Sequence, residues 1–172
     1  MIKTMLQFAL LFIIMIIVQT ICNHICIFGI AIPLVYIYFI VRLPINLSVN
    51  WVMTLTFFLG LTIDIFSNTQ GMNALACTIT AVLRRPIFSL YFAREDDLAN
   101  PIPSIRTLGT GIYIKYLLSI VLVFNIILFF IQSFTLSNIV LTLLRIVAST
   151  ILSTLLIFGI DSLDNTKREK RL

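Results

Sequence analysis

The stretch Gly60-Leu-Thr-Ile-Asp64-Ile-Phe-Ser-Asn-Thr-Gln-Gly71-Met-Asn73-Ala joins two apolar runs of the chain. Its acidic residue, Asp64, stands close to the end of the first run. A carboxylate there is poorly hydrated and lies at the negative end of its own helix, where the macrodipole disfavours an anion. Asp64 therefore needs a partner, and the sequence offers two: the backbone amides that open the next helix near Gly71 to Asn73, or the guanidinium of Arg145.

Small and polar residues recur every four positions before this junction. Thr56, Gly60 and Asp64 share one helical face, on which a neighbouring helix can pack tightly. Gly71 ends the short polar turn, because glycine turns sharply without steric cost. Asn73 starts a second face of small residues on the following run. We expect Thr56, Gly60, Asp64, Gly71 and Asn73 to hold the two helices together.

The composition of the chain is that of an integral membrane protein. Of its 172 residues, 60% are hydrophobic and only 11% are charged, whereas a soluble domain carries about 25% charged residues. At about 20 residues per helical span, the length allows five or six crossings and no large domain outside the membrane. The apolar runs are continuous rather than alternating, which excludes an outer-membrane barrel.

We therefore predict an all-α bundle of about six transmembrane helices in a single membrane domain, followed by a basic cytoplasmic tail at 161–172. The predicted spans cover residues 5–21, 28–41, 50–66, 72–92, 112–131 and 136–160. Pro33 is placed in the first turns of the second span, where a missing amide costs least. The fourth span is expected to be interrupted at Arg84-Arg85-Pro86.

The basic residues predict the orientation. With a cytoplasmic N-terminus, all the loops that are rich in Lys and Arg fall inside, and the breaks near Asn23, Asn68 and Ser133, which carry neither, fall outside. Both termini are then cytoplasmic, and Asp64 lies near the external face. Arg145 would lie roughly 12 Å deep at 1.5 Å per residue, in the same leaflet. It either pairs with Asp64 or snorkels alone to the surface.

Catalytic motifs are missing from the sequence. There is no H-E-x-x-H, G-x-S-x-G or Walker A pattern, and Asp64 has no second intramembrane acid beside it. Cys22, His24 and Cys26 are too few for a structural metal site, which needs four ligands. We expect no enzymatic activity, no metal and no cofactor, and no partner of the nucleic-acid class.

The pattern Gly60-Leu-x-x-Asp64-x-Phe-Ser-x-x-x-Gly71-Met-Asn-Ala-Leu resembles the signature of the MreD family, the bacterial rod shape-determining membrane proteins. The Pro33-Leu-x-Tyr-x-Tyr run that ends at Leu43-Pro44 resembles the same family. The resemblance implies a non-enzymatic subunit of the cell-elongation complex in the bacterial cytoplasmic membrane. It implies a fold similar to the substrate-binding components of energy-coupling-factor transporters.

The resemblance also implies partners. An MreD-like subunit binds the single-span protein MreC, and through it RodA with its class B transpeptidase, and helps couple peptidoglycan synthesis to MreB filaments. The alternative is a vitamin-binding transporter subunit on a similar fold, which needs an outward pocket lined by polar and aromatic groups. The single Trp51 is at the predicted inner boundary and the outer halves are poor in polar residues, which disfavours this alternative.

Overall fold

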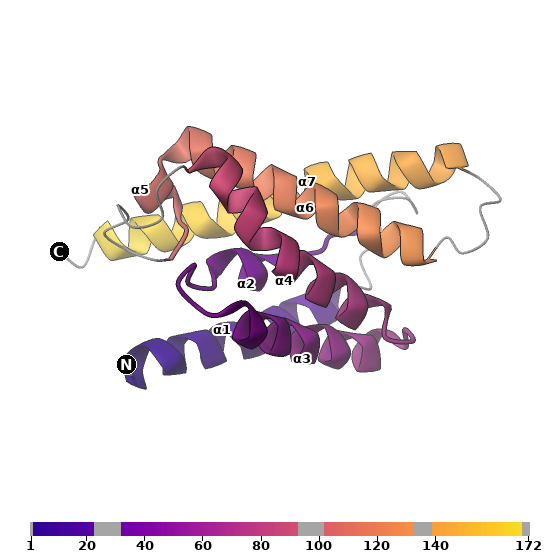
Figure 1. Ribbon diagram of the computed structural model, residues 1–172, viewed down its shortest axis with the longest axis horizontal. Helices are drawn as coiled ribbons and strands as arrows, with labels where there is room; N and C mark the ends of the chain where they lie inside the picture. The colour runs from indigo at the N-terminus through magenta and orange to yellow at the C-terminus, as the bar shows by residue number, and fades with distance from the viewer. Residues whose placement is uncertain (1, 23–31, 93–101, 133–138, 170–172) are drawn as a thin grey trace.

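The computed structural model is all-helical in the part of the chain that it describes, residues 2–22, 32–92, 102–132 and 139–169. Figure 1 shows most of the long helices lying roughly along one direction, with one of them crossing the others diagonally. In chain order they are α1 (Ile2–Cys22), α2 (Ile37–Arg42), α3 (Val49–Ser67), α4 (Met72–Tyr91), α5 (Ile105–Leu108), α6 (Thr110–Gln132) and α7 (Ile139–Glu169).

Three helices are long and apolar enough to cross a membrane: α3, α6 and the part of α7 from Ile139 to Ser162. A shorter apolar helix, Leu6–Cys22, lies within α1. Many large apolar side chains of these helices are exposed on the surface of the protein. A membrane span tolerates this, because lipid tails are as apolar as the side chains. α7 is the least covered of the three by the rest of the chain.

The predicted continuous helix at 28–41 is wrong in its described part. Residues 32–34 are not helical, a turn follows, and α2 begins only at Ile37. Pro33 has no amide to donate to a helix, and a proline also disfavours helical backbone in the residue before it. Residues 33–41 are nevertheless buried throughout, so this non-helical backbone lies in the middle of the protein.

Side chains from two other helices satisfy the exposed backbone groups of this segment. Ser149 and Ser153 of α7 accept hydrogen bonds from the amides of Ile32 and Leu34, at 3.1 and 2.9 Å. Gln19 of α1 accepts from the amide of Val35 and donates to the carbonyl of Pro33, at 2.9 and 3.0 Å. Irregular backbone at membrane depth is stable only when protein groups replace water in this way.

One further prediction needs correction. α4 is not interrupted at Arg84-Arg85-Pro86 but passes through Pro86 to Tyr91, since the helix tolerates the lost amide there. The described part of the predicted tail is helical, because α7 continues to Glu169, while its apolar membrane-length part ends at Ser162.

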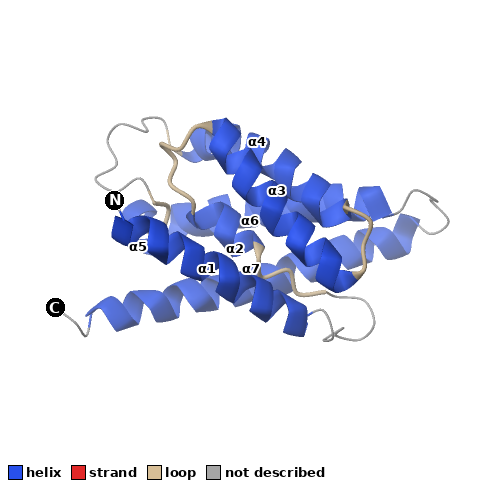
Figure 2. Cartoon of the chain, turned by 90° about the horizontal axis from the view of Figure 1, so that it is seen from below, coloured by secondary structure: helices blue, strands red, loops and turns tan. Residues whose placement is uncertain are grey.

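The bundle has two ends that differ in charge. One end of the bundle, at the left of Figure 1, holds the first residues of α1 and α3 and the last residues of α2 and α7. The view from below in Figure 2 shows the same arrangement. We call this the basic end, because Arg42 and Arg84 are bonded to neighbouring elements there. The other, the turn end, holds the α3–α4 turn at residues 68–71.

Candidate functional site

The chain reverses direction between α3 and α4 through two residues of left-handed backbone. Asn68 has φ 53° and follows the last turn of α3, while Gly71 has φ 75° and directly precedes α4. The amide of Thr69 donates to the carbonyl of Asp64 at 3.0 Å, which closes the end of α3. This tight reversal turns the first amides of α4 toward the last turn of α3.

The carboxylate of Asp64 accepts four hydrogen bonds and is only 3% exposed. Its Oδ1 accepts from the amide of Asn73 at 3.0 Å, from the side-chain Nδ2 of Asn73 at 2.9 Å, and from the hydroxyl of Thr69. Its Oδ2 accepts from the amide of Ala74 at 2.8 Å. The charge that the dipole of α3 disfavours is thus stabilised by the positive end of α4 and by charge-assisted hydrogen bonds.

A second layer of hydrogen bonds joins this cluster to the middle of the protein. The hydroxyl of Tyr36 donates to Oδ1 of Asn73 at 2.7 Å, and Nδ2 of Asn73 also donates to the hydroxyl of Thr69 at 3.1 Å. The ring of Tyr36 packs edge-on against Phe124 of α6, with 5.5 Å between centroids. Asn73 therefore connects the α3–α4 turn to the non-helical segment before α2.

Gly60 lies where the backbones of α3 and α4 approach each other closely. A Cβ added at this position would lie 2.6 Å from the Cα of Ala74 and 2.7 Å from its nitrogen and from the carbonyl oxygen of Asn73. Those atoms are backbone and cannot move aside, so only glycine fits. We call Gly60, Asp64, Thr69, Asn73 and Ala74 the Asp64 junction.

Three of the predicted site residues are not part of it: Gly71 lies in the turn directly before α4, and Thr56 and Arg145 lie elsewhere. Thr56 is buried on the same face of α3, but its hydroxyl donates to carbonyls of its own helix, those of Val52 and Met53. The described hydrogen bonds of Asp64 favour the first of its two predicted partners, the amides that open α4, and Arg145 is not among the partners described for it. Arg145 is exposed on α7, beside the exposed Leu141 and Leu144.

A second buried carboxylate, at the basic end, was missed from the sequence. Asp161 of α7 is 2% exposed; its Oδ1 accepts from Nη1 of Arg42 at 2.9 Å and from the hydroxyl of Tyr38 at 3.0 Å. Its Oδ2 accepts from the amide of Ile105 at 3.2 Å. We call these four residues the Asp161 cluster; it ties α2 and α5 to α7. One signal in the sequence could have indicated this cluster: Arg42 and Asp161 each directly follow a predicted span, and both of these span ends are on the predicted cytoplasmic side.

Metal ligation has no geometric support in the described part of the chain, where no three His, Cys, Asp or Glu side chains come together. Cys22 is half-buried at the end of α1, while His24 and Cys26 lie outside the described residues. The Asp64 junction can instead clamp two helices, since every donor around its carboxylate comes from the turn or the first residues of α4.

Comparisons of the chain with protein-family models, with curated proteins and with solved structures find no match, so the resemblance to MreD and to the transporter components stays a prediction.

Proposed function

We propose that this chain is a non-enzymatic scaffold subunit of the MreD type in a bacterial cytoplasmic membrane. The observation that supports it best is the Asp64 junction, where the single acid of the predicted signature accepts four hydrogen bonds from the turn and α4. A carboxylate held in this way stabilises helix packing. Residues of the predicted signature thus have a structural use that a scaffold requires.

The proposed subunit binds an MreC-like single-span protein and, through it, RodA and its class B transpeptidase. It helps couple peptidoglycan synthesis to MreB filaments on the cytoplasmic side. The basic end is cytoplasmic in this proposal, because it carries Arg42, Arg84 and Arg85. The cytoplasmic loops of membrane proteins carry an excess of Lys and Arg.

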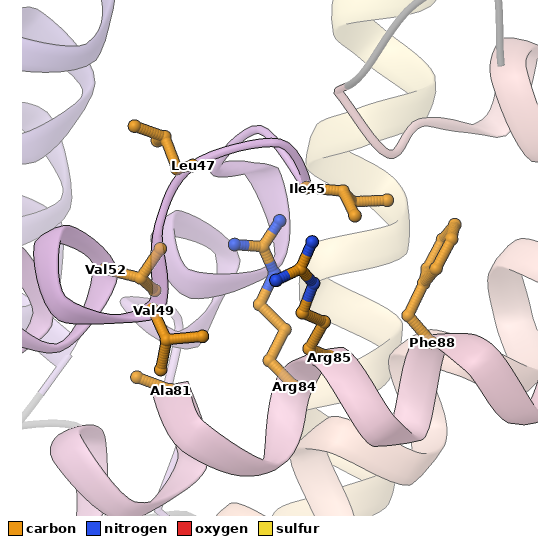
Figure 3. Close-up of a pocket in the computed structure, with 8 residues that line it drawn as sticks. All are labelled: Ile45, Leu47, Val49, Val52, Ala81, Arg84, Arg85 and Phe88. Carbon is orange, nitrogen blue, oxygen red and sulfur yellow. The ribbon is translucent and has the colours of Figure 1, made fainter. Parts of the chain in front are cut away.

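The alternative, a vitamin-binding transporter subunit, finds less support. The pocket drawn in Figure 3 has a volume of about 20 Å³, enough for about one water molecule. Three of its lining residues, Ile45, Arg84 and Arg85, lie between α2 and α3 or in the later part of α4, away from the turn end where an outward pocket is expected. A vitamin-sized ligand needs a much larger cavity.

Co-purification tests the proposal. The full chain is co-expressed with an MreC-like single-span protein, extracted in mild detergent and captured by a tag. We expect the partner to be retained, and we expect Asp64→Ala to lose most of it because the α3–α4 pair loosens. Arg145→Leu is the matched control and retains the partner, since Arg145 lies outside the junction.

Two results would contradict the proposal. The first is failure of the wild-type chain to retain the single-span protein under conditions in which it remains folded and monodisperse. The second is a stoichiometric small molecule in the purified protein, identified by mass spectrometry of the extracted sample, which would favour the transporter subunit.

A further inference from the structure

A pocket at the basic end brings two arginines together with an apolar wall. Figure 3 shows its lining, which comes from the α2–α3 connection, the first turns of α3 and the later part of α4. The lining residues are Ile45, Leu47, Val49, Val52, Ala81, Arg84, Arg85 and Phe88. None of the established contacts of the Asp64 junction involves this pocket.

Arg84 is a buried cation whose described partners are neutral. Its side chain is 4% exposed, its Nε donates to the hydroxyl of Tyr116 at 3.3 Å, and its Nη2 donates to the carbonyl of Leu43. Of the acids whose side chains the structure describes, Asp64 is at the junction and Asp161 pairs with Arg42. A buried charge is stable only when an opposite charge or strong dipoles compensate it.

Arg85 reaches the same pocket from the next position of α4, although its residue is exposed overall. Two guanidinium groups at one site match a phosphate group well, because each presents planar, forked N–H donors to phosphate oxygens. The volume of about 20 Å³ admits one oxygen atom, so the remainder of such a group would stay at the mouth.

We propose that this pocket binds the phosphate group of an anionic phospholipid. The apolar wall favours a lipid over a soluble phosphate, since the first turn of α3 also exposes Trp51, and α4 exposes Val82 and Leu83, on which acyl chains can pack. Basic pockets between helices at the membrane boundary bind anionic headgroups elsewhere for the same reason. This inference does not depend on the scaffold function.

Trp51, the single tryptophan of the chain, reports on the site. It lies in the first turn of α3, as the pocket residues Val49 and Val52 do, so a lipid with brominated acyl chains held at the mouth of the pocket comes close enough to quench its fluorescence. The full chain is reconstituted in phosphatidylcholine vesicles that contain an equal mole fraction of either brominated phosphatidylglycerol or brominated phosphatidylcholine. We expect stronger quenching by the phosphatidylglycerol.

Arg85→Gln is the main variant, because Arg85 is exposed, whereas Arg84 is buried and bonded to Tyr116 and Leu43. We expect its relative affinity for phosphatidylglycerol to fall about fivefold, the effect of one arginine near a charged headgroup. Arg145→Gln is the matched control: it removes the same charge from an exposed site on α7 and leaves the preference unchanged.

Three outcomes would overturn the proposal. They are equal quenching of the wild-type chain by the two brominated lipids, unchanged preference in Arg85→Gln, and equal losses in Arg85→Gln and Arg145→Gln. A titration with inorganic phosphate, against sulfate at the same ionic strength, separates the two sources of phosphate. If phosphate alone reverses the quenching, the ligand is a soluble phosphate and the lipid assignment fails.

Discussion

Two buried carboxylates in the described part of the chain, Asp64 at the turn end and Asp161 at the basic end, are stabilised in different ways. Asp64 has no cation among its hydrogen-bond partners and depends on the amides and side chains of nearby residues. Asp161 binds Arg42, together with Tyr38 and the amide of Ile105. The partners of Asp64 are at most 10 residues away in sequence, and those of Asp161 are 56 to 123 residues away.

This difference separates two tasks. The Asp64 junction completes one helical hairpin, so it depends on local sequence and on a close approach of two backbones at Gly60. The Asp161 cluster links elements from distant parts of the chain, and its cation, Arg42, is 13% exposed and can reach water. Loss of the first carboxylate should therefore cost more than loss of the second.

Asp64→Ala is expected to have the largest effect. It leaves the amides of Asn73 and Ala74 and the side chain of Asn73 without their acceptor, in a site closed to water. We expect the free energy of unfolding to fall by about 3–5 kcal/mol, as for removal of one partner from a buried charged network. Unfolding of the detergent-solubilised protein by increasing SDS, followed by circular dichroism, measures the loss.

Asp161→Ala is the matched comparison for this prediction, since it removes a buried carboxylate from the other end of the bundle. An equal or larger loss in Asp161→Ala than in Asp64→Ala would break the proposed ranking of the two sites.

Gly60→Ala tests the close approach that the junction requires. The added methyl would lie 2.6 Å from the Cα of Ala74, and we expect separation of α3 and α4 to cost about 1–3 kcal/mol, as in other overpacked sites. Gly159→Ala in α7 is the control, because its Cβ would meet nothing within 4 Å. This control should be neutral or gain about 0.5–1 kcal/mol from helix propensity, and the same SDS titration compares the two.

The fold and the Asp64 junction could be predicted in part because their signals are local. The spacing of Gly60 and Asp64 on one helical face, and the amides after Gly71, lie within a short stretch, so helix geometry alone brings them together. The sequence could not decide whether those amides or Arg145 would be the partner of Asp64, because both lie in the same predicted leaflet. The position of a residue along a span gives its depth in the membrane but not the direction in which its side chain points.

The Asp161 cluster and the non-helical segment could not be predicted for the opposite reason. Apolar residues around Pro33 indicate burial but do not distinguish a helix from irregular backbone, which needs donors and acceptors from elsewhere. Those come from Gln19, Ser149 and Ser153, of which the serines are 117 and 119 residues from the amides that they accept from. Only the tertiary arrangement brings them together.

Asp161→Asn is expected to have the smallest effect and separates charge from hydrogen bonding in the Asp161 cluster. The amide oxygen of asparagine can still accept from Tyr38 or from the amide of Ile105, while the ion pair with Arg42 is lost. We expect a loss of about 1–2 kcal/mol, because Arg42 is partly exposed and recovers some hydration. The loss should shrink as salt is raised, since ions screen the partly exposed pair. A loss as large as that of Asp64→Ala, and independent of salt, would show that the pair is as deeply desolvated as the junction and that the two ends do not differ in this respect.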